Sequence, residues 1–250
     1  MTDGFKDHFS GHAADYGQYR PQYPDALFTY LASVAPGTGM AWDCATGTGQ
    51  AAQGLADYFD TVIATDASAQ QIESSRNHAR IQYRVAPAED SGIPAGSIDL
   101  VTVAQALHWF DLDRFYAEAQ RVLKPGGVLA AWTYNLLHVT PRIDAQVNHL
   151  YGPLLDRFWP EERRLVEQGY KSMPFPFLEI PHPSFEMSTD WNLPQLMGYL
   201  GTWSAVQKYR REIGQDPLAI IASAISEAWG DPQATRKINW PLSMRLGRKA

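Results

Sequence analysis

The chain has 250 residues, of which 45% are hydrophobic and 19% charged, as in a globular protein with one sizeable core. Its net charge of −6 argues against nucleic acid as a partner, because neutralising phosphates requires clustered Lys and Arg. The single cysteine, Cys44, excludes an intrachain disulfide, and no apolar run approaches the ~20 residues of a membrane span. The polar N-terminus lacks the apolar core of a signal peptide. We therefore expect a cytoplasmic monomer or homodimer with no membrane partner.

Strand and helix patterns alternate over the first half of the chain. Apolar residues at helical spacing predict helices, and short apolar runs between them predict buried strands. The predicted strands span residues 40–44, 61–65, 81–86, 98–104 and 128–133. The predicted helices span residues 24–34, 51–59, 68–78 and 112–123. This order predicts a parallel sheet with right-handed crossovers.

The second half departs from this alternation. Two stretches have helical patterns, residues 143–168 and 193–229. Two others, residues 185–191 and 238–246, alternate between apolar and polar side chains. Such alternation predicts half-buried strands, and we expect the last of them to be antiparallel.

The most informative segment is a glycine turn between a predicted strand and a predicted helix, Asp43-Cys44-Ala45-Thr46-Gly47-Thr48-Gly49-Gln50. Glycines let the backbone turn sharply and let a ligand approach it, and the helix start offers free N–H groups. Asp66 follows the next predicted strand, where a carboxylate can accept hydrogen bonds from both hydroxyls of a ribose. The two features together predict a ligand built on adenosine.

Two cofactors fit this arrangement. The run Gly47-Thr48-Gly49-Gln50-Ala51-Ala52 matches the G-x-G-x-x-A pattern of nicotinamide dinucleotide enzymes. Asp43 favours S-adenosylmethionine instead, because a carboxylate before the glycines would repel a pyrophosphate but would hold an ammonium group. S-adenosylmethionine carries such a cationic amino-acid head and has no phosphate.

Further segments add to the glycine turn and Asp66. They are Ala88-Glu89-Asp90, Ser97-Ile98-Asp99-Leu100-Val101 and Arg121-Val122-Leu123-Lys124-Pro125-Gly126-Gly127. With them the chain resembles, from about residue 9 to residue 249, a class I S-adenosylmethionine-dependent methyltransferase. It is most similar to the trans-aconitate methyltransferase branch, through Tyr16-Gly17-Gln18-Tyr19-Arg20-Pro21, Ala106-Leu107-His108-Trp109-Phe110 and Gly201-Thr202-Trp203-Ser204. Ala45 stands where the family usually has its first glycine, and we expect a negative φ there.

The resemblance implies a Rossmann-like α/β fold with a seven-stranded, mostly parallel sheet, helices on both faces and an antiparallel last strand. One domain is expected over residues 1–250. Its core comprises residues of about 24–135 and the strands at about 183–191 and 237–247. Helical insertions at about 140–175 and 192–232 are expected to form a lid over the strand ends.

For S-adenosylmethionine, the resemblance implies a site at the strand ends. Its expected members are Tyr16, Tyr19, Arg20, Asp43, Ala45, Gly47, Gly49, Asp66, Ala67, Ala88, Glu89, Asp90 and Gln105. Asp43 and the backbone of Ala45 and Gly47 would hold the methionine end, and Asp66 would hold the ribose. Asp66 has an alternative role, as the N-cap of the following helix.

The remaining members surround the adenine, the sulfonium and the cofactor carboxylate. Ala67 and Ala88 would line the adenine, and either Glu89 or Asp90 would meet its amino group, unless both lie in a solvated loop. Gln105 would approach the sulfonium or the methionine moiety. Tyr16, Tyr19 and Arg20 fall on one helical face, from which the Arg could pair with the cofactor carboxylate. The alternative for these three is a surface helix that docks its tyrosines.

The acceptor is expected beside His108 and Trp109, which follow the fourth strand at the carboxyl edge where such folds bind ligands. His108 would orient a substrate or act as a base, and its alternative is a buried, hydrogen-bonded histidine. Trp203 would roof the site, or belong to a core. The histidines show no metal-ligand spacing, so no metal is predicted.

We therefore expect methyl transfer to a small molecule. A carboxylate oxygen is the first acceptor to consider, since it is ionised at neutral pH and needs no base. The rival is C- or O-methylation of a quinone-like or phenolic metabolite, with His108 as a base. Two other classes stay open: an NAD(P)-dependent oxidoreductase, and a cofactor-binding protein without catalysis.

Overall fold

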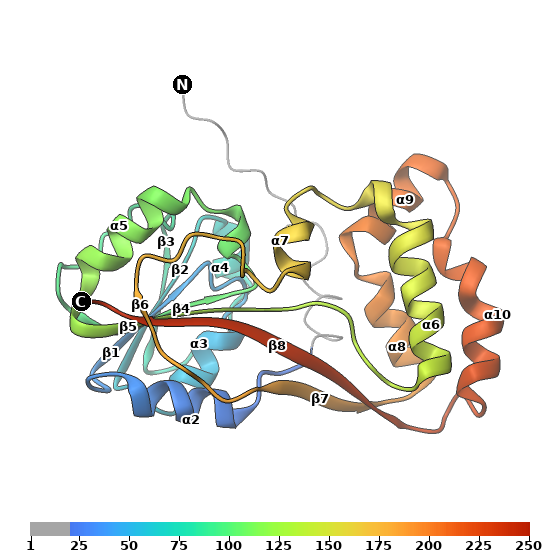
Figure 1. Ribbon diagram of the computed structural model, residues 1–250, viewed down its shortest axis with the longest axis horizontal. Helices are drawn as coiled ribbons and strands as arrows, with labels where there is room; N and C mark the ends of the chain where they lie inside the picture. Colours follow the sequence, from blue (N-terminus) through green and yellow to red (C-terminus); the bar gives the residue numbers. More distant parts are fainter. Residues whose placement is uncertain (1–20) are drawn as a thin grey trace.

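A computed structural model describes residues 21–250. Its centre is an eight-stranded sheet, in which the first five strands are parallel in the order β3-β2-β1-β4-β5 (Figure 1). These strands are β1 (Met40–Cys44), β2 (Thr61–Asp66), β3 (Ile81–Val85), β4 (Ile98–Ala104) and β5 (Leu123–Tyr134). All five agree with the predicted strands, although β5 begins earlier. β4 is buried almost throughout, as its apolar run indicates.

Three later strands complete the sheet. β8 (Arg236–Arg248) runs antiparallel to β5. β6 (Leu178–Glu179) and β7 (Glu186–Trp191) both pair with β8, β6 near its end and β7 over its first half. β6 and β7 lie one after the other along β8 and together occupy one strand position in the sheet. The eight strands therefore correspond to the seven strand positions that were predicted. The mostly parallel α/β sheet with an antiparallel last strand is confirmed.

Helices cover both faces of the parallel part of the sheet (Figure 1). α2 (Asp25–Val34) and α3 (Gln50–Leu55) pack against one face. α5 (Leu112–Val122) and α7 (Arg163–Glu167) pack against the other. One helix of the first insertion, α7, therefore packs directly against the sheet.

Two helices are shorter than predicted, and the first of them, α3, ends at Leu55 and not at residue 59. α4 (Ala69–Glu73) begins at its expected N-cap, Ser68, but does not continue to residue 78. The Ser74 hydroxyl donates to the Gln70 carbonyl at 2.8 Å, and the Ser75 hydroxyl donates to a carbonyl three residues before it. Such local bonds compete with the helical ladder and favour its end.

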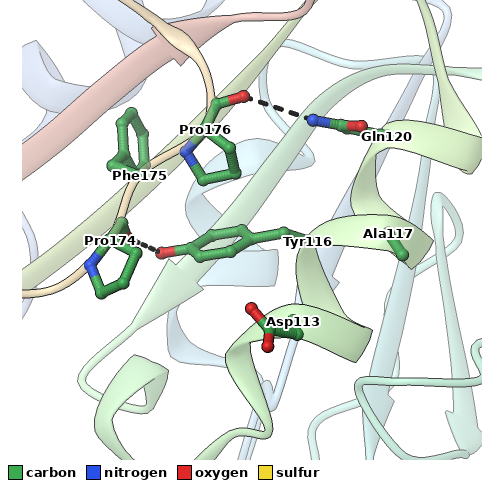
Figure 2. Close-up of a pocket in the computed structure, with 7 residues that line it drawn as sticks. All are labelled: Asp113, Tyr116, Ala117, Gln120, Pro174, Phe175 and Pro176. Atoms are coloured by element: carbon green, nitrogen blue, oxygen red, sulfur yellow. Dashed lines mark hydrogen bonds between the residues drawn. The ribbon is translucent and has the colours of Figure 1, made fainter.

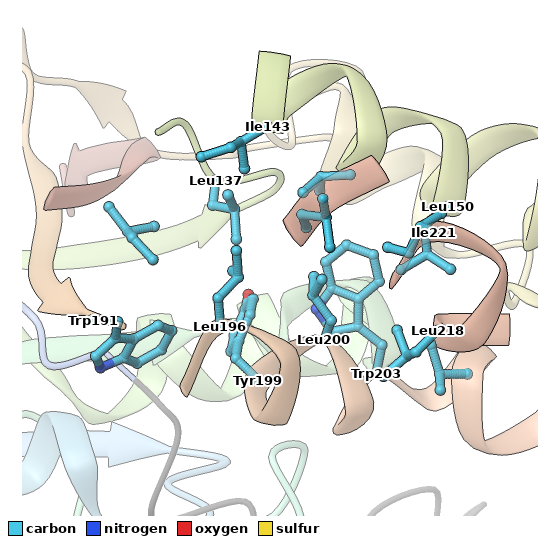
Figure 3. Close-up of a cluster of buried hydrophobic side chains, with 14 of the residues drawn as sticks. Leu137, Ile143, Leu150, Trp191, Leu196, Tyr199, Leu200, Trp203, Leu218 and Ile221 are labelled. Carbon is cyan, nitrogen blue, oxygen red and sulfur yellow. The ribbon is translucent and has the colours of Figure 1, made fainter. Parts of the chain in front are cut away.

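The remaining helices form a lobe on the side where β5 ends (Figure 1). They are α6 (Pro141–His149), α8 (Leu193–Gly201), α9 (Ser204–Ile213) and α10 (Pro217–Trp229). The lobe has its own hydrophobic cluster, which includes Leu196, Leu200, Trp203 and Ile221 (Figure 3). β7 and the first half of β8 also contribute to this cluster. Among the helices that the structure describes, none has both the length and the apolar character to cross a membrane.

Candidate active site

The glycine turn joins β1 to α3, as predicted. Ala45, Gly47 and Gly49 have positive φ angles of 54°, 56° and 90°. The expectation of a negative φ at Ala45 is therefore wrong. The cause is the path of the turn: the Thr46 N–H donates to the Thr65 carbonyl of β2 at 2.9 Å, so the chain bends towards β2 directly after β1. An alanine in this left-handed region costs about 1–2 kcal/mol, which the turn retains as strain.

Gly49 is required for space as well as for conformation. A Cβ at this position would lie 2.2 Å from the Tyr83 hydroxyl. Gln53 holds that hydroxyl in place, since its Nε2 donates to it at 3.1 Å. At Gly47, in contrast, a Cβ would meet only Gln71, at 3.9 Å, among the described residues. The described side chains therefore leave space beside the Cα atom of Gly47.

Asp43, which we expected at the ammonium group, is fully buried at the end of β1. Its Oδ2 accepts a hydrogen bond from Thr46 Oγ1 at 2.5 Å, and its Oδ1 accepts one from Thr102 Oγ1 at 2.8 Å. Burial raises the pKa of this carboxyl group to about 6. In this structure Asp43 braces the turn against β4, and its contact with the cofactor stays a prediction.

Asp66 lies beside the glycine turn. Its Oδ2 accepts a hydrogen bond from the Gly47 N–H at 2.9 Å, and its Oδ1 accepts one from the Ser68 N–H at 2.9 Å. The N-cap of α4 is Ser68 itself, so Asp66 supports this cap without replacing it. Its contact with a ribose stays a prediction. The next residue, Ala67, is exposed beside Asp66.

Glu89 and Asp90, the two candidates for contact with the adenine amino group, have different surroundings. Glu89 is half-buried, and its Oε1 accepts a hydrogen bond from the Asp111 N–H at 3.2 Å. Burial, Asp43 and Glu89 together raise the pKa of the Cys44 thiol, which places Glu89 near the glycine turn. Asp90 is exposed, on the side of Arg121. The geometry therefore favours Glu89 for the adenine amino group.

An ion pair between the buried Glu118 and the exposed Arg121 fixes the loop that carries Glu89. Glu118 accepts hydrogen bonds from the Ser91 N–H at 2.9 Å and from Arg121 Nε at 2.7 Å. Hydrogen bonding from Arg121 outweighs burial and lowers the pKa of Glu118 to about 2. Ala88, the other expected adenine contact, is buried in this loop.

Tyr16, Tyr19 and Arg20 lie outside the described residues, so their contact with the cofactor carboxylate stays a prediction. The described chain begins with Pro21, whose carbonyl accepts a hydrogen bond from Gln50 Nε2 at 2.5 Å. This bond fixes Pro21 beside the first residue of α3.

Gln105 follows β4 and has a positive φ of 58°. Its Nε2 donates to the Tyr134 carbonyl at 2.9 Å, and its Oε1 accepts a short hydrogen bond from Thr133. The amide group is therefore bound to the end of β5, which ties the tips of β4 and β5 together. The predicted approach of Gln105 to the sulfonium or the methionine moiety stays a prediction.

His108 lies in a short 3-10 helix directly after β4, and Trp109 contacts its ring, with 4.7 Å between the centroids. Its Nδ1 is 2.9 Å from the hydroxyl of Tyr170, a residue of the first insertion. Burial and, secondarily, Arg163 lower the pKa of His108 to about 4. The imidazole is therefore neutral at physiological pH. Tyr170 is held at a positive φ of 62°, as Ala45 and Gln105 are, and such strain is typical of functional sites.

Arg163, at the start of α7, supplies a positive charge beside this histidine. Its Nε donates to the Tyr151 hydroxyl at 2.7 Å, and its Nη2 donates a short hydrogen bond to Asn135 Oδ1, just after β5. The guanidinium carbon lies 5.1 Å from the centre of the Tyr151 ring and 4.9 Å from that of Trp159. Trp203 touches both rings from the helical lobe but is itself buried in the lobe's cluster.

Comparison with known proteins agrees with these features. A methyltransferase-domain model matches residues 42–131. A Dictyostelium discoideum protein assigned to the methyltransferases is 32% identical over 252 residues, which cover 98% of this chain and 96% of that protein. A solved structure from Anaeromyxobacter dehalogenans, assigned as a type II methyltransferase, is 51% identical with a TM-score of 0.89, and covers 92% of this chain and 98% of its own. The chain belongs to the class I S-adenosylmethionine-dependent methyltransferases.

A further match extends over part of this methyltransferase. A Saccharomyces cerevisiae protein named as an S-adenosylmethionine-dependent methyltransferase is 33% identical over 131 residues, or 49% of this chain and 45% of that protein. Together the matches favour S-adenosylmethionine over the nicotinamide alternative for the glycine turn. The likeness to the trans-aconitate branch stays a prediction.

The methyltransferase also has a groove between α5 and residues 174–176 (Figure 2). Tyr116 Oη donates to the Pro174 carbonyl at 2.7 Å, and Gln120 Nε2 donates to the Pro176 carbonyl at 3.2 Å, so the two walls are tied together. The groove is lined by none of the predicted site residues. The candidate active site of the methyltransferase is therefore at the strand ends.

Sequence reasoning missed the part of the site that the first insertion supplies. Tyr170 and Arg163 lie far from His108 in sequence, and nothing in their local pattern places them beside it. A partial signal was available, because two aromatic residues, Tyr151 and Trp159, precede Arg163 closely in a segment otherwise assigned to a lid. Aromatic rings near an Arg are a common setting for cation–π contacts.

Proposed function

We propose that this methyltransferase transfers the methyl group of S-adenosylmethionine to a carboxylate oxygen of a small molecule. The observation that carries the proposal is the protonation state around His108. The pKa of His108 is lowered to about 4, while burial raises the pKa of Tyr170 and raises that of Tyr151 to about 12. A general base works best with a pKa near the operating pH, and none of these three groups has one. An acceptor that is already ionised needs no such base.

S-adenosylmethionine supplies an electrophilic methyl group, and a C–O bond forms as its C–S bond breaks, with no proton to move. The residues of the chain would bind, orient and shield. Asp66 and the space beside Gly47 suit a ribose and a methionine end, and the turn over residues 43–50 has no Lys or Arg that would favour a pyrophosphate. Neutral His108 would orient the acceptor by a hydrogen bond, and the surrounding rings would exclude water.

The phenolic alternative requires a proton to leave the acceptor hydroxyl. His108 could accept it as a neutral imidazole, but its lowered pKa makes it a weak base. A carboxylate is therefore the better match to this site, and the resemblance to the trans-aconitate branch points the same way.

Pure protein, radiolabelled S-adenosylmethionine and a panel of polycarboxylates and phenols test the proposal. The expected product is a methyl ester that alkali hydrolyses, formed with carboxylates only. The variant His108→Asn is expected to keep on the order of a tenth of this activity, since orientation and not proton transfer is lost. Label found only in phenols, and abolished in His108→Asn, would contradict the proposal. Tight cofactor binding with no transfer to any acceptor would favour the non-catalytic alternative.

A further inference from the structure

The guanidinium of Arg163 is positioned but not neutralised. Among the described residues its hydrogen-bond partners are the phenol oxygen of Tyr151 and the amide oxygen of Asn135, both uncharged. Among residues 21–250, no carboxylate lies within ion-pair distance of it. Glu167 reaches this group only indirectly, as the acceptor of a short hydrogen bond from the Tyr151 hydroxyl. A half-buried Arg without an ion-pair partner favours an anion beside it.

The two hydrogen bonds leave part of the guanidinium fork available. Arg has five N–H donors in a planar fork, and a carboxylate can accept two of them side by side. One bond uses Nε and one uses Nη2, so N–H groups at the Nη1 end have no partner among the described residues. The rings of Tyr151 and Trp159 lie close to the guanidinium on its faces, which restricts its rotation and prepares the free edge for binding.

Arg163 lies on the acceptor side of the site. Asn135 follows the last residue of β5, and the adjacent Tyr134 carbonyl binds Gln105 at the tip of β4. Arg163 is also close enough to His108 to act on its imidazole by charge. Charge, free donors and position therefore coincide within the region where the acceptor is expected.

We propose that Arg163, fixed by Asn135 and by the rings of Tyr151 and Trp159, anchors an anionic group of the acceptor other than the oxygen that is methylated. The inference rests on the proposed function in its choice of reaction, but the anchor itself is a binding site and can be tested by binding alone. It makes Arg163 a specificity-determining residue, which selects acceptors with at least two anionic groups over neutral ones.

Calorimetry on the protein loaded with S-adenosylhomocysteine measures the anchor without catalysis. The probes are succinate, citrate and the uncharged diamide succinamide. Arg163→Met removes the charge and keeps an apolar side chain of similar length, and Arg163→Lys keeps the charge but not the planar fork. Arg157→Met is the matched control, because the Arg157 guanidinium also stacks on a ring, 4.9 Å from the centre of Phe158, but is exposed.

Arg163→Met is expected to weaken succinate and citrate binding by on the order of 10- to 100-fold, the effect of losing a charge-assisted bidentate hydrogen bond. Arg163→Lys is expected to lose less, and Arg157→Met to bind as the wild type does. The affinity for S-adenosylhomocysteine is expected to stay unchanged in all three variants, which also shows that they are folded.

The anchor would be overturned if Arg163→Met bound anions as the wild type does, or if succinamide bound as tightly as succinate. It would also be overturned if the wild type bound no anion at millimolar concentration. A loss of S-adenosylhomocysteine affinity in Arg163→Met would overturn it as well, and would assign Arg163 to the cofactor.

Failure of the proposed function has a different signature. If anions bind through Arg163 but no carboxylate is methylated, the anchor stands and the reaction is wrong. If wild type and Arg163→Met methylate carboxylates equally, the reaction stands and the anchor is wrong.

Discussion

The two halves of the candidate site are built in different ways. The cofactor half lies at the tips of β1 and β2, where backbone N–H groups of the turn bond to the β2 tip and two glycines carry positive φ angles. The acceptor half consists of side chains from distant segments: His108 after β4, Asn135 after β5, and Arg163 and Tyr170 from the first insertion. A turn that needs positive φ angles favours glycine, which can be recognised in the sequence. A site assembled from distant side chains leaves at most a partial local signal. The halves should therefore respond differently to substitution.

The largest effect is expected in the cofactor half, from Gly49→Ala. The new Cβ would overlap the Tyr83 hydroxyl and would also force alanine to a φ of 90°. Overpacking and the left-handed conformation together should cost about 3 kcal/mol or more of unfolding free energy. Gly47→Ala has the same conformational problem without the overlap and should cost about 1–2 kcal/mol. Urea unfolding measures both.

Affinity for S-adenosylhomocysteine, measured by calorimetry, separates the two glycines further. Gly47→Ala places a methyl group in the space beside the Gly47 Cα atom and should weaken binding despite its milder effect on stability. If Gly49→Ala proves no more destabilising than Gly47→Ala, the described contact with Tyr83 is not a constraint on the turn.

Next in size are two opposite pH effects, one from each half. The pKa of Asp43 is raised from 3.8 to about 6, so the folded state holds this proton more tightly and stability falls as pH rises from about 4 to about 6. The pKa of His108 is lowered from 6.5 to about 4, so the folded state resists protonation and stability falls as pH drops from about 6.5 to about 4. Each shift corresponds to about 3 kcal/mol, and in the wild type they largely offset each other.

Removing either group should reveal the pH dependence that the other group gives to the unfolding free energy. In Asp43→Asn the unfolding free energy should increase with pH between about 4 and 6.5, and in His108→Asn it should decrease over nearly the same range. Urea unfolding at a series of pH values gives both slopes. Two parallel profiles would show that one of these groups is not buried as described.

The fold was predictable because its signals are local and repeated. The strands β1, β2 and β4 are short, largely apolar runs, and Asp111 and Ser68 cap their helices where the sequence indicates. The end of α4 was not predictable from apolar spacing, because two serine side chains decide it. Nor was the division of the outer strand into β6 and β7, which depends on how both pair with one long partner, β8.

The cofactor half was largely predictable for the same reason, with two physical exceptions. Asp43 is buried between Thr46 and Thr102, and this burial decides whether its carboxylate faces the ligand. Thr102 belongs to another strand, β4, so the contact could not be predicted from the local sequence. The choice between Glu89 and Asp90 depends on the direction of each side chain in the loop. The acceptor half required the tertiary structure, since only folding brings Arg163 and His108 together.

A smaller effect is expected from Tyr170→Phe in the acceptor half. The substitution removes the hydroxyl that lies 2.9 Å from His108 Nδ1 and so frees the imidazole to change its tautomer and orientation. We expect kcat to fall by roughly 3- to 10-fold, with the S-adenosylhomocysteine affinity unchanged. Nitrogen NMR of His108 should show a shifted tautomer balance, which a purely structural role would not produce. Tyr116→Phe, which loses a hydrogen bond to Pro174 away from the site, is the control and should leave kcat and the spectrum unchanged.

The smallest expected effect is a gain in stability from Ala45→Gly in the cofactor half. Glycine adopts the observed φ of 54° without the steric cost that alanine bears, but it also has more conformational freedom to lose on folding. The difference should leave a net gain of about 0.5–1 kcal/mol in urea unfolding. Ala67→Gly is the matched control, since Ala67 is an exposed residue at the tip of β2 with no positive φ, and it should lose about 0.5–1 kcal/mol. Opposite signs for the two substitutions would show that the strain lies in the turn itself, whereas a loss at both would mean that Ala45 is not held in the left-handed region.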